Sequence, residues 1–371
     1  MTENNALFWL NPRNVMVGME FEIQPIGPIK VIEKFTSYNR LVMLVERKAD
    51  RHKLIIKTFR FRDVPANMNT RENLKVIADQ IERYKTELRQ ARVLTSHGIG
   101  FVFQNDVNGE PVLIQYEDYA GTTCSHDLRN LPLSEMEKIH VIVEAILRDC
   151  LKPLFENAPN PFLPGTVIVG LDANPRNFTW MTVEGVTRAF SVDLFPAKIF
   201  DPQTGFYSLE FPEPQDEVVR DLGIERHYTM SGLIINFWSN LTRVRPELAE
   251  AFYLQIETFL RTNGYDEVEG LIDEYLQVSN FPNLRKFPLR VGTLSKKDIA
   301  RIIIRWSFRD IFRLRLVANA LAYYRSGSRE LLENIFRQSH FQNNPLSSDQ
   351  IRRIKALLLQ MADYPVDQKE K

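Results

Sequence analysis

The 371-residue chain has only two cysteines, Cys124 and Cys150, and no excess of either charge. Two cysteines are too few for a metal framework, and a disulfide-stabilised scaffold of this length would use more. Lysine plus arginine and aspartate plus glutamate each total 47, which argues against a general nucleic-acid binder while leaving room for a local basic patch. We therefore expect reduced thiols, a cytoplasmic protein and no nucleic-acid partner.

Long apolar runs are also missing from the sequence. Without a stretch of about 18 apolar residues, no transmembrane helix is expected. The first residues, MTENNALFWLNPRN, have neither the basic segment nor the sustained apolar segment of a signal peptide. Hydrophobic residues (44%) and charged residues (25%) occur in globular proportions, so the length suits a packed, two-lobed chain without membrane insertion.

The first third of the chain shows β-type runs around one helical pattern. Runs rich in β-branched residues are separated by polar turns, and an Asn-Gly pair at 108–109 is typical of a hairpin. Between them, apolar residues recur three or four positions apart after a capping Asn69 or Thr70. The pattern predicts strands at 29–35, 40–48 and 52–61, a helix within 69–99, and a hairpin over 100–118.

Helical patterns prevail from residue 133 onward. A helix is expected at 134–156, opened by Ser134 with Glu137 at the capping-box spacing. A strand at 166–172 and hairpin arms at 177–183 and 186–196 interrupt this helical part. Further helices are predicted at 229–243, 246–263, 266–277, 296–326, 328–337 and 348–362.

Residues 168–196 place two carboxylates and an amide among apolar side chains. Asp172 and Asn177 stand five positions apart in LDANPRN, and Asp193 follows in SVDLFP. Each residue alone is uninformative, because aspartate and asparagine commonly cap turns. Their order and apolar surroundings together make a shared chemical role the better interpretation.

Four motifs, taken together, resemble a kinase-like fold, and most closely small-molecule phosphotransferases of the aminoglycoside-phosphotransferase and choline-kinase type. Lys57 in LIIKTF matches the third-strand lysine, and Glu87 in TELRQARV matches the helix glutamate that pairs with it. Asp172 and Asn177 match the D-x-x-x-x-N catalytic loop. Asp193 matches the second metal-binding aspartate.

The resemblance covers roughly residues 28–200 and implies an α+β, bilobal, protein-kinase-like fold. A small antiparallel N-lobe with one helix would span residues 1–117. A larger, mainly helical C-lobe would span residues 118–371, with the catalytic-loop hairpin at 166–196.

The same resemblance implies an ATP- and Mg²⁺-dependent phosphotransferase that acts on a hydroxyl group of a small molecule. Phosphoryl transfer needs positioning and charge neutralisation more than covalent chemistry, and Mg²⁺ prefers oxygen ligands. Asp172 would act as the base or orient the acceptor hydroxyl. Asn177 and Asp193 would bind Mg²⁺, and Lys57 held by Glu87 would contact the phosphates of ATP.

Two further segments are expected to contact the nucleotide. The segment QYEDYAG at 115–121 would form the hinge between the lobes, with Gln115, Tyr116 and Glu117 beside the adenine. The turn KFTSYNR would lie over the phosphates, with the hydroxyl of Ser37 or Thr36 assisting its backbone amides.

Departures from the family pattern keep other functions open. Gly170 stands where such families usually have histidine, and the turn at 34–40 contains no glycine. Both departures favour a pseudokinase, a binding or scaffolding module without turnover. Transfer of a nucleotidyl group, with ATP bound in reverse, is a weaker alternative.

A basic stripe recurs every four residues in ARIIIRWSFRDIFRLRL, at Arg301, Arg305, Arg309 and Arg313. Such a stripe could bind an anionic substrate. We instead predict that it meets the acidic segment EPQDE at 213–217, or solvent, and stays away from Asp172.

Overall fold

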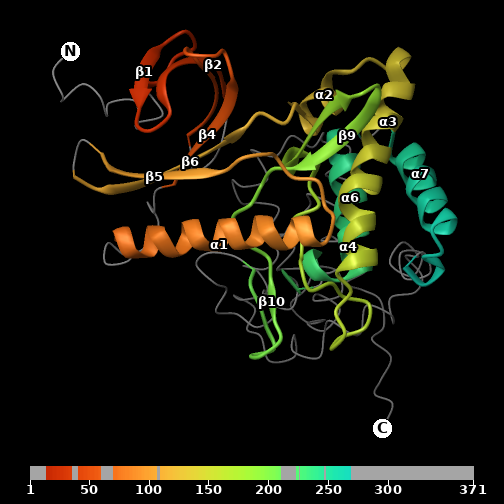
Figure 1. Ribbon diagram of the computed structural model, residues 1–371. Helices are drawn as coiled ribbons and strands as arrows, with labels where there is room; N and C mark the ends of the chain where they lie inside the picture. Colours follow the sequence, from red (N-terminus) through yellow and green to blue (C-terminus); the bar gives the residue numbers. More distant parts are fainter. Residues whose placement is uncertain are drawn as a thin grey trace, which may run out of the picture.

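In the computed structural model, an antiparallel sheet with one long helix is joined to a mainly helical part (Figure 1). The described residues are 14–35, 41–59, 70–106, 109–209, 223–224, 226–245 and 248–268. The six-stranded sheet has the order β1-β2-β3-β4-β6-β5. Its strands are β1 (Glu20–Ile23), β2 (Gly27–Phe35), β3 (Val42–Arg47), β4 (Lys53–Phe59), β5 (Gly100–Asn105) and β6 (Pro111–Asp118).

The sheet has one strand more than the sequence patterns predicted. The expected strands before the helix correspond to β2, β3 and β4, and β1 pairs with β2 across a tight turn. Gly27, with φ of +89°, closes that turn in a conformation that favours glycine. Strand β1 has only four residues, too few for a reliable alternation of apolar and polar side chains.

Alternate side chains of the sheet enter two different cores. On β4, Leu54 and Ile56 face a core enclosed by the curled strands, whereas Phe59 packs with the helix side. Lys57 has the same parity as Phe59, so its side chain also leaves the sheet on the helix side. The alternation of side chains along the strand thereby separates the core enclosed by the sheet from the face that carries Lys57.

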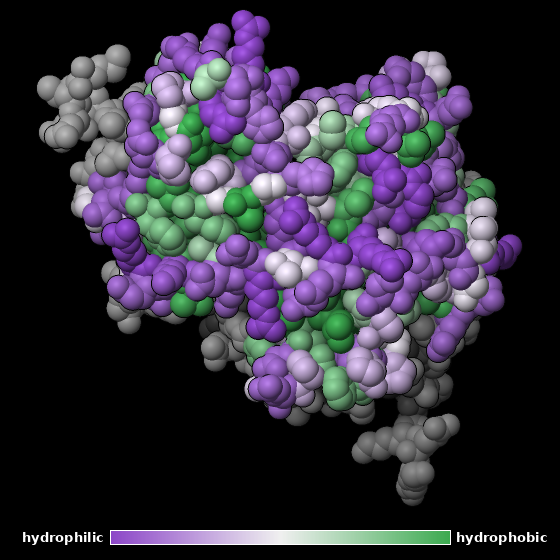
Figure 2. All heavy atoms as spheres, in the orientation of Figure 1, coloured by the Kyte–Doolittle hydropathy of each residue, from purple (hydrophilic) through white to green (hydrophobic). Residues whose placement is uncertain are grey.

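Helix α1 (Arg71–Gln90) covers that second face and confirms the predicted helix. Thr70 accepts a hydrogen bond from the Asn73 amide at 3.2 Å, which caps the first turn. Figure 1 shows α1 running beside β5 and β6, and Figure 2 shows apolar side chains between α1 and the strands with hydrophilic ones outside. The buried stripe comprises Leu74, Ile77, Ala78, Ile81, Tyr84, Lys85 and Leu88.

The helix predicted at 134–156 is a single rod with a change of pitch inside it. A π-helical turn at Leu147–Leu151 joins α3 (Met136–Ile146) to α4 (Lys152–Asn157). Pro153 has no amide hydrogen for the carbonyl of Asp149, four residues earlier, and that carbonyl accepts from Leu94 N at 3.2 Å instead. Proline therefore explains the irregular turn and its link to the end of α1.

The other elements of the second part confirm the hairpin and two of the helices. Strands β8 (Phe178–Val183) and β9 (Val186–Ser191) are joined by Glu184 and Gly185, both at positive φ, as a two-residue hairpin turn requires. The remaining elements are β7 (Thr122–Thr123), α2 (Cys124–Asn130), β10 (Phe200–Asp201), β11 (Phe206–Tyr207), α6 (Met230–Val244) and α7 (Ala249–Thr262).

The strand predicted at 166–172 is wrong, because this segment forms isolated bridges with several partners. Thr166 pairs with Thr229, Val167 with Pro159, and Val169 with Ile199. Partners that change at each step cannot form a continuous ladder, although they do fix the backbone that leads to Asp172.

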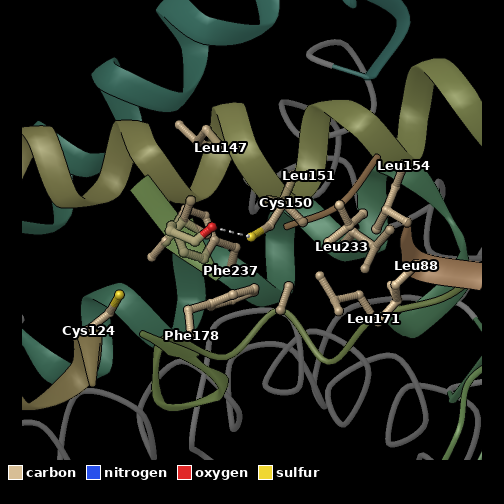
Figure 3. Packing of buried hydrophobic residues seen from close by; sticks show 14 of the residues in the cluster. Leu88, Cys124, Leu147, Cys150, Leu151, Leu154, Leu171, Phe178, Leu233 and Phe237 are labelled. Carbon is tan, nitrogen blue, oxygen red and sulfur yellow. Dashed lines mark hydrogen bonds between the residues drawn. The ribbon is translucent and has the colours of Figure 1, made fainter. Parts of the chain in front are cut away.

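One apolar core joins α1 to this segment. Figure 3 shows Leu88 of α1, Leu154 of α4, Leu171 and Leu233 of α6 in the same cluster. Cys150 also lies there and donates a weak hydrogen bond to the Ala189 carbonyl at 3.7 Å. Both cysteines are free thiols, as predicted, and burial raises their pKa values, so they act as apolar filling.

Several predictions fall outside the described residues. These are Ser37, the arginine stripe at 301–313, the acidic segment 213–217 and the helices predicted beyond residue 268. Within the described ranges, no helix has the length and apolar character needed to span a membrane. The predicted α+β architecture, a curled antiparallel sheet with one helix beside a mainly helical part, is confirmed.

Candidate active site around Asp172

Asp172 is held by three side chains from two parts of the chain. Its Oδ1 accepts from Arg226 Nη2 at 3.1 Å and from Asn236 Nδ2 at 3.3 Å. Its Oδ2 accepts from Asn177 Nδ2 at 2.9 Å, and the same amide group also reaches the Asp172 carbonyl at 3.1 Å. The loop of residues 172–177 is thus closed by its own first and last side chains.

The surroundings of Asp172 keep it ionised. Burial acts to raise its pKa, but Arg226, followed by His227, Lys198 and Arg176, outweighs burial and holds the pKa well below the usual range. Burial, Lys198 and Arg226 also lower the pKa of His227, so His227 is neutral at pH 7. The arginines and Lys198 therefore stabilise the carboxylate at neutral pH.

A buried amide network behind the loop fixes its shape. Asn174 Oδ1 accepts from the Arg176 amide at 3.2 Å, and its Nδ2 donates to Asn240 Oδ1 at 3.1 Å. Asn240 Nδ2 then donates to the carbonyl of Asn236 at 2.7 Å and to its side-chain oxygen at 3.0 Å. Asn236 also accepts from Arg226 Nε at 3.1 Å. Every member is hydrogen-bonded, as a buried polar network requires.

Sequence analysis did not identify Asn174, Arg226, Asn236 or Asn240 as part of the site. One signal was present, because Asn236 and Asn240 stand four apart in the apolar stretch SGLIINFWSNL and lie on one face of α6. Arg226 has no such pattern, and only the tertiary fold brings it to Asp172 across 54 residues.

The glycine at position 170 has a steric explanation. A Cβ atom there would lie 2.7 Å from the His227 carbonyl oxygen and 2.8 Å from the ring of Tyr228. The His227 Nδ1 donates to the Leu171 carbonyl at 3.1 Å, and the Leu171 amide donates to the His227 carbonyl at 3.0 Å. A histidine from a distant segment thus supports the backbone next to Asp172.

Gly170→Ala should lower the free energy of unfolding by about 1–3 kcal/mol, because the methyl group must displace backbone and a buried ring. Tyr228 cannot move easily, since its hydroxyl donates to the Ser208 carbonyl and its ring packs 4.6 Å from that of Tyr207. Urea unfolding checks the value. Gly223→Ala is the control, because its nearest neighbour at 3.1 Å is the end of the Leu209 side chain, and an equal loss in both variants would contradict this account.

Asn177 and Lys57 both contact the backbone that leads into Asp193. The Val192 amide donates to the Asn177 carbonyl at 3.0 Å, and Lys57 Nζ donates to the Val192 carbonyl at 2.6 Å. The Tyr84 hydroxyl of α1 donates to the Gly170 carbonyl at 2.6 Å. Burial raises the pKa of Tyr84, and the negative charges of Asp193 and Asp172 raise it further.

The predicted ion pair between Lys57 and Glu87 is wrong. Lys57 Nζ lies 2.5 Å from Glu117 Oε1, whereas Glu87 lies 3.9 Å from Arg83, one turn away on the same helix. The phase of α1 explains the difference. Lys85 and Leu88 belong to the buried stripe, which leaves Glu87 on its border with a side chain 29% exposed.

Lys85 takes the buried position on that helix face. Its Nζ donates to the Gly98 carbonyl at 2.6 Å and to Ser96 Oγ at 3.2 Å. Burial lowers the pKa of Lys85 to about 8, and the nearby Glu117 carboxylate only partly offsets it. The folded chain therefore binds this proton less tightly than the unfolded chain does.

The free energy of unfolding of the wild type should rise relative to Lys85→Met as the pH increases from about 8 to 10. In this window the unfolded lysine, with a pKa of about 10.4, still binds a proton that the folded one has released, so stability rises with pH. Urea unfolding at several pH values measures the difference. Lys75→Met, an exposed position on the same helix, should reproduce the wild-type slope. Equal slopes in wild type and Lys85→Met would contradict the assignment.

The three residues predicted beside the adenine do not share one face. Gln115 pairs in register with Lys57, and its side chain is buried on the same face as those of Lys57 and Glu117. Tyr116 points the other way and lines a cavity of about 170 Å³ at the open end of the curled sheet. Their contacts with a nucleotide stay a prediction.

Asn177 and Asp193 carry oxygen atoms of the kind that a hard divalent ion accepts. Asn177 turns its amide nitrogen to Asp172, so its amide oxygen faces away from that carboxylate, and its backbone is tied to the residue before Asp193. One amide and one carboxylate oxygen are ligands that Mg²⁺ accepts. In the described part of the chain, no group of three or more His, Cys, Asp or Glu side chains is arranged for a metal.

Comparison with known proteins identifies no family for this chain. No family model matches the chain, and no curated protein matches it. Among solved structures, it is similar to the crystal structure of the BubR1 kinase domain, with 12% identity and a TM-score of 0.35. The match covers 62% of this chain and 65% of that domain, slightly less than two thirds of its length.

Proposed function

We propose that this protein is a phosphotransferase that uses ATP and Mg²⁺ to phosphorylate a hydroxyl group of a small molecule. The carrying observation is that Lys57, Asn177 and Asp172 are linked through the backbone at Val192. Residues from the sheet, the loop after Gly170 and the end of β9 thereby meet at one place. The motifs of aminoglycoside-phosphotransferase and choline-kinase type support the same activity.

We assign a role to each of these side chains. Lys57, with 12% of its side chain exposed, would bind phosphate oxygens of ATP. Asn177 and Asp193 would hold Mg²⁺, which neutralises phosphate charge during transfer. Asp172 would orient the acceptor hydroxyl. With its pKa far below neutral it is a weak general base, so we assign it positioning rather than early proton abstraction.

A second candidate function, a pseudokinase that binds partners without turnover, is favoured by a different observation. The Lys57 ammonium already contacts Glu117 and the Val192 carbonyl, and both oxygens of Asp172 accept hydrogen bonds from protein groups. A catalytic cycle must replace or supplement these contacts when substrates bind, whereas a scaffold would keep them.

ATP with Mg²⁺ should raise the melting temperature of the purified chain, and turnover should appear with at least one hydroxylated small molecule. Ligand at 100 times its Kd adds about 2.7 kcal/mol to the free energy of unfolding. Thermal shift measures binding, and mass spectrometry of the acceptor identifies the transferred group. Binding without turnover across a broad panel would favour the pseudokinase, and the absence of nucleotide binding would refute the phosphotransferase.

A further inference from the structure

We propose that Glu117 of strand β6 is the positioning residue for Lys57, and that α1 contributes no carboxylate to this task. The catalytic importance of this pair rests on the proposed phosphotransferase function. The pair itself can be tested without any activity. The proposal predicts a lysine clamp whose carboxylate is supplied by the sheet.

The Glu117 carboxylate is built into the sheet beside Lys57. Glu117 stands on the strand that pairs with β4, so both side chains leave neighbouring strands on the same face. The Lys57 ammonium lies 2.5 Å from Glu117 Oε1, with 2% of the Glu117 side chain exposed. A carboxylate fixed by a central strand has little freedom to withdraw.

The second oxygen of Glu117 is held as firmly as the first. Ser96 Oγ donates to Glu117 Oε2 at 2.5 Å, and Lys85 Nζ donates to Ser96 Oγ at 3.2 Å. Arg89 Nη2 donates to the Ser96 carbonyl at 3.1 Å, which fixes the backbone of that serine. Glu117 is therefore oriented before any ligand binds, as a positioning residue must be.

Helix α1 is attached to the site through contacts that do not use Glu87. Tyr84 donates to the Gly170 carbonyl and Lys85 to the Gly98 carbonyl, each at 2.6 Å. These buried contacts anchor the helix on both lobes. Helix α1 also supports Glu117 indirectly, because Lys85 and Arg89 hold Ser96, but the carboxylate that contacts Lys57 comes from the sheet.

The test is the rate at which Lys57 reacts with a water-soluble acetyl ester, measured peptide by peptide by mass spectrometry. Glu117→Gln should react roughly tenfold faster at Lys57, because the amine loses its charged partner. Glu87→Gln is the matched control and should leave the rate within about twofold. Acetylation of exposed Lys75 serves as the internal reference in every sample.

Ser96→Ala keeps the charge of Glu117 but removes the donor to its second oxygen, and should raise the Lys57 rate by about threefold. This variant decides the question if Glu117→Gln fails to fold. Wild-type reactivity in both variants, or an equal increase in Glu87→Gln, would overturn the proposal.

Nucleotide affinity provides a separate readout. The Kd for ATP with Mg²⁺ should increase roughly tenfold in Glu117→Gln and stay within about twofold in Glu87→Gln. If the wild type binds no nucleotide, the proposed function fails, and the acetylation rates alone then support or overturn the role of Glu117.

Discussion

Replacing Arg226 with methionine should lower the free energy of unfolding by about 3 kcal/mol at pH 7, because it leaves a buried carboxylate without its cation. The side chains of Arg226 and Asp172 are 11% and 16% exposed, so water can compensate little. Methionine keeps the apolar volume of the arginine stem, which separates the loss of charge from a loss of packing. Urea unfolding measures the change.

The loss should also depend on pH in a defined direction. The folded-state pKa of Asp172 lies below its unfolded value, so its contribution is fully present above about pH 4 and fades as the pH falls toward the folded value. The difference between wild type and Arg226→Met should therefore shrink between about pH 4 and pH 2.

Arg83→Met is the matched control for this prediction. Arg83 pairs with Glu87 at 3.9 Å on the surface of α1, and its side chain is 65% exposed. Removing such a pair should change stability by less than about 0.5 kcal/mol. A loss in Arg226→Met that is as small as this, or that is constant down to pH 2, would show that Arg226 does not stabilise the Asp172 carboxylate.

Short-range patterns were sufficient for most elements of the fold. The buried stripe of α1 follows directly from apolar residues at helical spacing, and the turn at Glu184 and Gly185 follows from local backbone preference. The π turn at Leu147–Leu151 could not be predicted in this way. It depends on Pro153 and on a hydrogen bond from Leu94, a distant residue just after the end of α1.

The candidate site likewise contains residues that local sequence patterns identify and residues that they do not. Asp172, Asn177 and Asp193 stand close in sequence and could be grouped from their order alone, and the structure joins Asn177 to Asp172 and to the residue before Asp193. The partner of Lys57 was mispredicted because the phase of a helix decides which side chains face the sheet. A shift of two residues exchanges Glu87 for Lys85 on that face.

Arg226 is a residue of the site that no local sequence pattern predicts. Its guanidinium reaches Asp172 only because residues 226–228 run beside Gly170 and Leu171, where the glycine permits close approach. Sequence reading treated Gly170 as the loss of a supporting histidine. In the structure, His227 supports the backbone beside Asp172 from a different segment of the chain. The absence of a side chain at Gly170 leaves room for that segment.

Asp193→Asn should abolish Mg²⁺-dependent nucleotide binding, whereas Asp172→Asn should retain it and lose phosphate transfer. An amide at position 193 removes the negative charge that a hard divalent ion requires. Asp172 accepts hydrogen bonds from Arg226, Asn236 and Asn177. We therefore expect it to orient the acceptor and to contribute little to ATP affinity. Loss of this orientation should lower turnover by about 100-fold or more.

Calorimetric titration of ATP with and without Mg²⁺, followed by single-turnover transfer to the best acceptor, separates the two roles. Asp201→Asn is the control, because that carboxylate only accepts hydrogen bonds from Gln203 and Thr204 in its own turn. Equal loss of nucleotide binding in Asp172→Asn and Asp193→Asn would mean that both carboxylates hold the metal. Unchanged nucleotide binding in Asp193→Asn would remove this aspartate from the site and would contradict the proposed Mg²⁺-dependent phosphoryl transfer.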